Sequence, residues 1–263
     1  MSSDQAINTK AKRNEPDAAT IPEASWGQAA PPADTAAGWL VGLLQAGDSF
    51  YPTGSYAHSF GLEGLVQGGV VRDRATLREF LFRSVLPSLQ RVELPLAAHA
   101  WRAFGAEDWR AIGDLSRLSS ALKPSREIRT ASENIGRQRT ELVALLHPHS
   151  LVTEYLRRVT EGAWPFSAPI AASLEGRVLG APQVAVLSGI YYTSVASLLS
   201  AAMKILRLGQ NAAQSLLSEA LAAAPEVIAA AERVPVDEIG WFNPWLDIAA
   251  ARHETADSRM FIS

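Results

Sequence analysis

The amino-acid sequence predicts an all-α protein, folded as a single compact multi-helix domain, on three observations. After about residue 36, apolar side chains recur almost throughout at the three- and four-residue spacing of helices. Strand-like alternation with hairpin turns is absent over any convincing length. The chain has 263 residues, 48% of them apolar, which suffices for one large core, and no short-period repeat indicates a solenoid.

Residues 1–36 are predicted to be a disordered N-terminal extension that precedes the all-α domain at 37–263. The extension is rich in Ala, Pro, Asp, Thr and Gln and has few large apolar side chains. Such a segment cannot bury enough surface to offset its conformational entropy. The alternative is a segment that orders on a partner.

The first two helices of the domain have clear boundary signals. Thr35 is a candidate N-cap for the first helix. One face of that helix is apolar, with Trp39, Leu40, Leu43 and Leu44. A second, short helix is expected to open at Gly61, with Ser59 as candidate N-cap, and to stop at Gly68 and Gly69.

Prolines suggest where the following helices divide. Asp73 is a candidate N-cap for the third helix, and Pro87 and Pro95 are expected to separate it from the next one. A further amphipathic helix is expected in EDWRAIGDLSRLSSAL, residues 107–122. A long helix follows Pro124, and its inward-facing positions are predicted to be Ile128, Ile135, Leu142 and Leu145.

The second half of the chain contains an uncharged stretch, Val178 to Met203, that is long enough to span a bilayer. It also carries a proline, a glutamine, two tyrosines and many Ser and Ala, so a helix buried on all sides by other helices is favoured over a membrane span. Two more helices are expected at 211–223 and 225–232, with Pro225 opening the second one.

Composition excludes several classes of function. The chain has 24 basic and 27 acidic side chains and a pI near 6.0, which argues against a nucleic-acid partner. Without any cysteine, the chain forms no disulfide, no cysteine-zinc site and no thiol nucleophile. The first twenty residues contain no apolar leader, so a cytoplasmic location is expected.

Catalytic and cofactor motifs are also absent. The sequence has no P-loop, no dinucleotide fingerprint, no H-E-x-x-H and no G-x-S-x-G, so we expect neither a cofactor nor enzymatic activity. His147-Pro148-His149 is a rigid pair that could seat a divalent metal. A helix-terminating turn with exposed imidazoles is the commoner role of such a pair, and the sequence leaves nickel contact open.

The stretch DSFYPTGSYAHSFGLEGL, residues 48–65, is dense in hydroxyls around one histidine and one carboxylate. Pro52 and Gly54 indicate a turn in which the glycine adopts positive φ. Tyr56, His58 and Glu63 are expected on one side of that turn as a recognition surface. The alternative is an all-α enzyme that uses Ser55, His58 and Glu63, but no signature supplies an oxyanion site or an orienting group.

Two further stretches carry unusual side chains. Residues 203–214, MKILRLGQNAAQ, place Lys204 and Arg207 in a last helical turn, where the helix dipole favours cations. The C-terminal stretch RHETADSRMFIS, residues 252–263, combines charged and apolar side chains: His253, Glu254, Arg259 and Phe261. Such a set suits the groove of a partner, and a tail folded back on its own domain is the alternative.

Together and in this order, the three stretches resemble the UreF family of urease accessory proteins. The family's turn and Gly-Leu-Glu appear as Pro52-Thr-Gly-Ser-Tyr-Ala-His-Ser-Phe-Gly-Leu-Glu63, and its Leu-Gly-Gln-like block as Lys204-Ile-Leu-Arg-Leu-Gly-Gln210. Its tail appears as His253-Glu-Thr and Ser258-Arg-Met-Phe-Ile-Ser263. The resemblance covers roughly residues 38–263. Met260 in place of Leu, Lys204 in place of Arg, and the apolar Ile262 depart from the usual pattern.

The resemblance implies a non-catalytic protein that is dimeric within its working complex. Such a protein bridges a UreD/UreH-type scaffold and the GTPase UreG, gates GTP hydrolysis, and helps to deliver nickel to apo-urease. Its C-terminal tail becomes ordered against the scaffold, where Arg259 and Phe261 would be the anchors. The partner-binding residues carried over are Pro52, Gly54, Tyr56, His58, Glu63, Lys204, Arg207, Gln210, His253, Glu254, Arg259 and Phe261.

Overall fold

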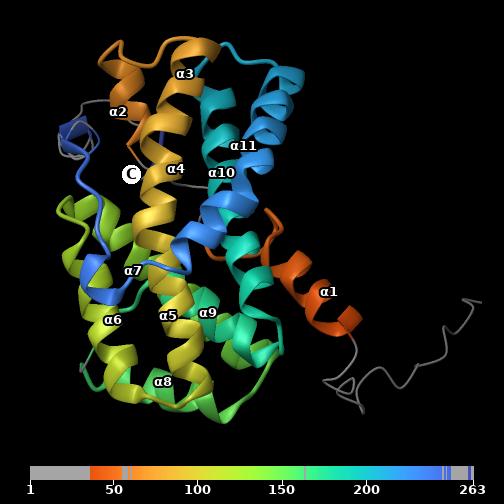
Figure 1. Ribbon diagram of the computed structural model, residues 1–263, viewed down its shortest axis with the longest axis vertical. Helices are drawn as coiled ribbons and strands as arrows, with labels where there is room; N and C mark the ends of the chain where they lie inside the picture. The colour runs from red at the N-terminus through yellow and green to blue at the C-terminus, as the bar shows by residue number, and fades with distance from the viewer. Residues whose placement is uncertain are drawn as a thin grey trace, which may run out of the picture. The chain divides into compact units, whose positions relative to one another are not determined.

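The axis of the fold is one helical run from Arg74 to Gly105, which Figure 1 shows running vertically through the molecule. The computed structural model describes residues 36–54, 59, 61–162, 164–244, 246, 248–249 and 260–261, and these residues belong to one compact unit, 33–263. No strand occurs in these ranges, which confirms the predicted all-α fold class. The predicted extension at 1–36 lies almost entirely outside them, and its boundary stays a prediction.

The elements follow the chain in simple order. The α-helices are α1 Ala36–Ala46, α2 Leu62–Gln67, α3 Arg74–Phe80, α4 Leu86–Ser88, α5 Leu94–Gly105, α6 Trp109–Ala121, α7 Arg126–Leu146, α8 Ser150–Thr160, α9 Ala168–Val178, α10 Gln183–Ile205 and α11 Gln210–Ala231. Two π-helical segments, η2 Leu81–Val85 and η3 Leu89–Glu93, and a 3₁₀ turn, η4 Val236–Glu238, complete them.

The predicted division of the third helix at Pro87 and Pro95 is wrong. Each proline is the second residue after a π-helical segment, and the helix continues through both. A proline has no N–H to donate to the carbonyl four residues before it. The wider π turn that precedes each proline makes that hydrogen bond unnecessary. The Arg91 carbonyl, four residues before Pro95, accepts a hydrogen bond from the Gly240 N–H at 3.0 Å.

Two apolar clusters form the core, and both include residues of this axis. The first joins α2, α3, α10 and α11, and its fully buried members include Leu77, Tyr191 and Leu216. The second joins α5, α6, α8 and α9 around Phe104 and Tyr155. Since the run from α3 to α5 contributes to both clusters, it links the two halves of the domain.

Helix α10, which holds most of the uncharged stretch, is buried on one side only. It is long and apolar enough to cross a membrane, but this single finding is weak evidence because core helices share those properties. Leu187, Tyr191 and Val195 face the first cluster, whereas Val184 and Tyr192 are exposed. The expectation of burial on all sides is therefore wrong for this second face.

Two smaller predictions also fail. The helices expected at 211–223 and 225–232 are one helix, α11, with Pro225 inside it. Burial of Val227 and Ile228 in the first cluster compensates for the lost backbone hydrogen bond. Leu145 is 75% exposed, because ten residues beyond the buried Ile135 the helix has turned about 80° away from the core.

A matched pair of glycines tests the close crossing of α7 and α9. An added Cβ at Gly136 would lie 2.6 Å from the backbone carbon of Ser167, whereas at Gly189 in α10 it would meet nothing within 4 Å. We expect Gly136→Ala to lower the free energy of unfolding by about 1–3 kcal/mol. Gly189→Ala should raise it by up to about 1 kcal/mol. Urea denaturation measures both, and equal effects would contradict the crossing.

Candidate functional site

The three stretches singled out in the sequence meet at the start of α2. The Glu63 carboxylate, in the first turn of α2, accepts the Met260 N–H at 2.8 Å and the Phe261 N–H at 3.0 Å. The Lys204 ammonium lies 5.5 Å from the centre of the Phe261 ring. Glu63 and Phe261 are both buried. We call this set of residues, Glu63, Lys204, Met260 and Phe261, the tail dock.

The backbone of α2 allows the C-terminal segment to lie close. Gly61 has φ 84°, a left-handed conformation that places the start of the helix. Ser59 accepts the Glu63 N–H through its hydroxyl at 3.3 Å, as expected of the predicted N-cap, although the helix itself begins after Gly61. A Cβ on Gly64 would lie 2.6 Å from the Ala249 carbonyl oxygen, so only glycine fits there.

The dock recognises the backbone of the tail more than its side chains. A carboxylate that accepts two neighbouring backbone N–H groups makes charge-assisted hydrogen bonds, which are stronger than neutral ones. The Gln67 amide also donates to Glu63, at 3.5 Å. Phe261 is the side chain that the dock buries, and the facing Lys204 adds a cation–π contact. Met260 remains 61% exposed.

The other predicted residues are placed as follows. Gly54 has φ 75°, which confirms the predicted positive φ, and Pro52 lies exposed in the same turn. Arg207 is exposed between α10 and α11, and Gln210 is exposed as the first residue of α11. Tyr56, His58, His253, Glu254 and Arg259 lie outside the described residues, and so does Ser55 of the alternative catalytic set.

The histidine pair acts at helix ends. His149 is the N-cap of α8, where its Nδ1 accepts the Leu151 N–H at 3.1 Å, and His147 ends α7. A ring nitrogen engaged in this way does not ligate a metal at the same time. Within the described ranges, no group of three or more His, Asp or Glu side chains could hold a metal ion.

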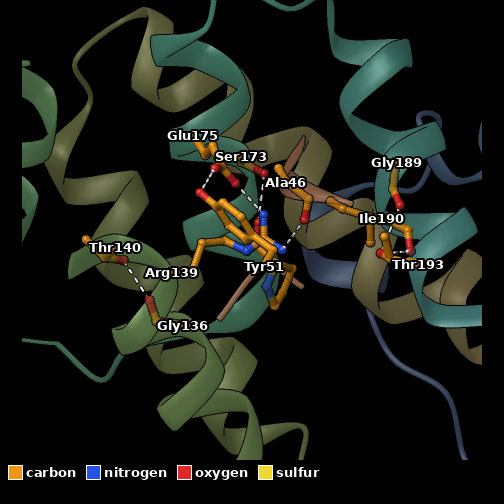
Figure 2. A network of polar contacts seen from close by, with 11 residues as sticks. Ala46, Tyr51, Gly136, Arg139, Thr140, Ser173, Glu175, Gly189, Ile190 and Thr193 are labelled. Carbon is orange, nitrogen blue, oxygen red and sulfur yellow. Dashed lines mark hydrogen bonds and ion pairs between the residues drawn. The ribbon is translucent and has the colours of Figure 1, made fainter. Parts of the chain in front are cut away.

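A buried polar network fixes the other side of the predicted turn. Figure 2 shows Tyr51, Arg139 and Glu175 converging from the turn, α7 and α9. The Tyr51 hydroxyl and the Arg139 guanidinium both donate to the Glu175 carboxylate, and Arg139 also donates to the Ala46 carbonyl at 3.4 Å. Burial, followed by the charge of Glu175, raises the pKa of the Tyr51 hydroxyl above its ordinary value.

Sequence reasoning missed this network. Arg139 and Glu175 stand 36 residues apart on different helices, and no local pattern connects them. The one available signal is a carboxylate within the otherwise apolar helix APIAASLEGRV. A carboxylate that is 2% exposed needs a charged or hydrogen-bonding partner.

The fold and the dock define an all-α protein in which Met260 and Phe261 pack against the start of α2. Residues 71–221 match the model of the UreF family. The chain is 32% identical over 225 residues to the urease accessory protein UreF of Paenarthrobacter aurescens (strain TC1), covering 86% of this chain and 98% of that protein. It is 33% identical over 216 residues to that of Methylorubrum populi, covering 81% and 94%.

A third relative, the urease accessory protein UreF of Azoarcus sp. (strain BH72), is 31% identical over 224 residues, which are 85% of this chain and 95% of that protein. The chain therefore belongs to the UreF family of urease accessory proteins, and its role lies in urease maturation.

Removing the charge of Glu63 should loosen the tail. In Glu63→Gln, one acceptor oxygen becomes an amide that cannot accept the tail N–H facing it. We expect the Met260 and Phe261 amides to exchange with solvent about tenfold faster or more, which corresponds to about 1.4 kcal/mol. Amide hydrogen exchange measures this. Glu79→Gln, at an exposed carboxylate paired with Arg83, is the control, and equal exchange in both variants would contradict the dock.

Proposed function

We propose that this protein is a nickel-delivery chaperone of urease that acts through protein contacts. It bridges a UreD/UreH-type scaffold and the GTPase UreG during maturation of the urease nickel centre, and gates GTP hydrolysis there. Nickel is its cargo. The observation that supports this proposal best is the tail dock, since the three stretches that carry the family resemblance meet in it.

The scaffold contact falls on the C-terminal segment. Glu63 holds Met260 and Phe261 by their backbone N–H groups, which leaves the Met260 side chain exposed. Earlier in the same segment, Trp241, Phe242 and Ile248 are 44%, 83% and 46% exposed. Aromatic anchors of this kind dominate the binding energy of protein interfaces. Phe261 supports the scaffold contact indirectly, because its buried ring holds the tail in place. Arg259 is proposed to contact the scaffold directly.

The GTPase contact falls next to the dock, on the loop between α10 and α11. Arg207 is exposed in that loop, and Lys204 of the dock at the end of α10 and Gln210 at the start of α11 are exposed on either side of it. The chain has no nucleotide-binding motif of its own. The nucleotide therefore comes with the partner. A polar surface adjacent to the docked tail would let the GTPase bind only when the tail is in place, which couples the two contacts.

The homodimer of the working complex is expected to form through α1. In Figure 1, α1 lies to one side of the other helices of the domain. Leu40, Val41 and Leu44 are 47–66% exposed along it, and Phe50 in the following turn is 93% exposed. Val184 and Tyr192 extend this apolar surface onto α10, which α1 contacts. A second copy of the chain offers the same apolar face, so a two-fold dimer would bury the apolar surfaces of α1 and α10 in both copies.

Removal of the tail should abolish assembly with the scaffold. We expect the full-length chain to form one complex with a UreD/UreH-type scaffold and UreG, and a chain that ends before His253 to form none, because it lacks the residues that fill the dock. Light scattering after co-purification measures the mass of each species. Equal assembly of both chains would move the scaffold contact onto the helical body and contradict this role of the tail.

A charge on α1 should break the dimer. Val41→Asp places a carboxylate in the proposed interface, where burying it unpaired costs several kcal/mol. We expect the mass of the complex to halve, as measured by light scattering. Val70→Asp, at a similarly exposed valine after α2, is the matched control and should leave the mass unchanged. If both variants halve the mass of the complex, or if neither does, α1 is not the interface.

A further inference from the structure

A cavity of about 220 Å³ lies between the turn that follows α1 and the helices α7, α9 and α10. Its volume exceeds that of the cavity of about 150 Å³ that holds benzene in an engineered protein. Protein interiors contain few voids larger than one water molecule. A cavity of this size therefore has room for an organic molecule of roughly eight non-hydrogen atoms.

The walls of the cavity keep it open. Gly47, Ala168 and Ala172 line it with small side chains, while Ile135 and Ile190 supply apolar surface. The opposite wall comes from the π-distorted run, through residues 85–93. Such π turns occur frequently at functional sites. One larger side chain at any of the small positions would fill the space.

Hydroxyl groups face this cavity without a partner. Ser88, Ser194 and Ser197 line it, and none of them makes a hydrogen bond within the described part of the chain. Ser197 is only 3% exposed. A hydroxyl that lines a cavity and makes no hydrogen bond within the protein is free to bond a molecule held there. A bound molecule with a hydrogen-bonding group would satisfy the Ser197 hydroxyl.

The charges that line the cavity indicate what kind of molecule fits. The Lys123 ammonium lies 3.0 Å from the Glu93 carboxylate and donates to the Ser119 carbonyl at 3.3 Å. Arg139 is paired with Glu175. Asp48 also lines the cavity, but it is exposed and its carboxylate accepts the Phe50 N–H at 2.6 Å. An anion would have to displace Glu93 or Glu175 from its partner, and a cation within the cavity would lie beside the Lys123 ammonium; both are costly. The lining has no histidine for a metal ion.

We propose that this cavity is a binding site for a small neutral molecule with an apolar body and one hydrogen-bonding head group, an alcohol or an amide. The apolar body lies against Ile135 and Ile190, and the head group reaches Ser197. This inference does not rest on the proposed function, because the residues that it uses, Ile135, Ile190 and Ser197, belong neither to the tail dock nor to the α1 face.

Three probes with one shape and different charges test the proposal: benzyl alcohol, benzoate and benzylammonium. Ligand-observed NMR titration of the full chain should give saturable binding of benzyl alcohol, with Kd on the order of 1 mM. The two ions should bind about tenfold more weakly or not at all. No saturable binding of benzyl alcohol, or equal binding of all three, would overturn the proposal.

Two variants test whether the probe binds in the cavity. Ala172→Leu fills the space and should abolish saturable binding, whereas Ala222→Leu, the same change at an exposed position of α11, should not. Ser197→Ala keeps the space, removes the hydroxyl and should weaken Kd about fivefold. If Ala172→Leu does not fold, the Ser197→Ala variant still tests the proposal. An unchanged Kd for benzyl alcohol in Ser197→Ala would refute the contact between the head group and Ser197.

Discussion

Two prolines inside one continuous helix set the geometry on which the rest of the domain depends. Pro87 and Pro95 are accommodated by the π-helical segments η2 and η3, so the chain runs without a break from Arg74 to Gly105. This run contributes to both apolar clusters and forms one wall of the cavity. Its Arg91 carbonyl also accepts a hydrogen bond from Gly240, which ties the C-terminal segment to the axis.

Two buried carboxylates hold the functional stretch at its two ends. Glu175 fixes Tyr51 through a hydrogen bond and is itself compensated by Arg139 (Figure 2). Glu63 is satisfied by backbone N–H groups of the tail. Burying either carboxylate without a partner would cost free energy, so the groups that donate hydrogen bonds to it are needed for stability. The stretch at 48–65 is thus a structural element that also positions the tail.

The exposed apolar surfaces match a protein that works within an assembly. Single exposed apolar side chains are ordinary, but contiguous patches mark interaction sites. Here they lie on α1 with α10, and on the C-terminal segment around Trp241 and Phe242. The two patches belong to different parts of the chain, which suits a bridging role better than a single binary contact. The cavity borders both regions, since Ala46 of α1 and Leu246 of the C-terminal segment line it.

The sequence by itself determined the helical class, several helix boundaries and the family. Asp73 caps α3, Gly54 adopts positive φ, and α2 ends at Gly68, because capping and turn preferences depend on a few neighbouring residues. The sequence also pointed to Glu63, Lys204 and Phe261, but not to the contacts they make.

Only the tertiary structure decided which of these residues meet. Glu63 and Phe261 are 198 residues apart, and Arg139 and Glu175 lie on different helices; no local pattern encodes such pairs, since they result from how the helices pack. Packing also overrode local preference at Pro95 and Pro225, where burial of the surrounding apolar face keeps the helix continuous. Local chemistry fixes where helices start and turn, and the shared core fixes what they bring together.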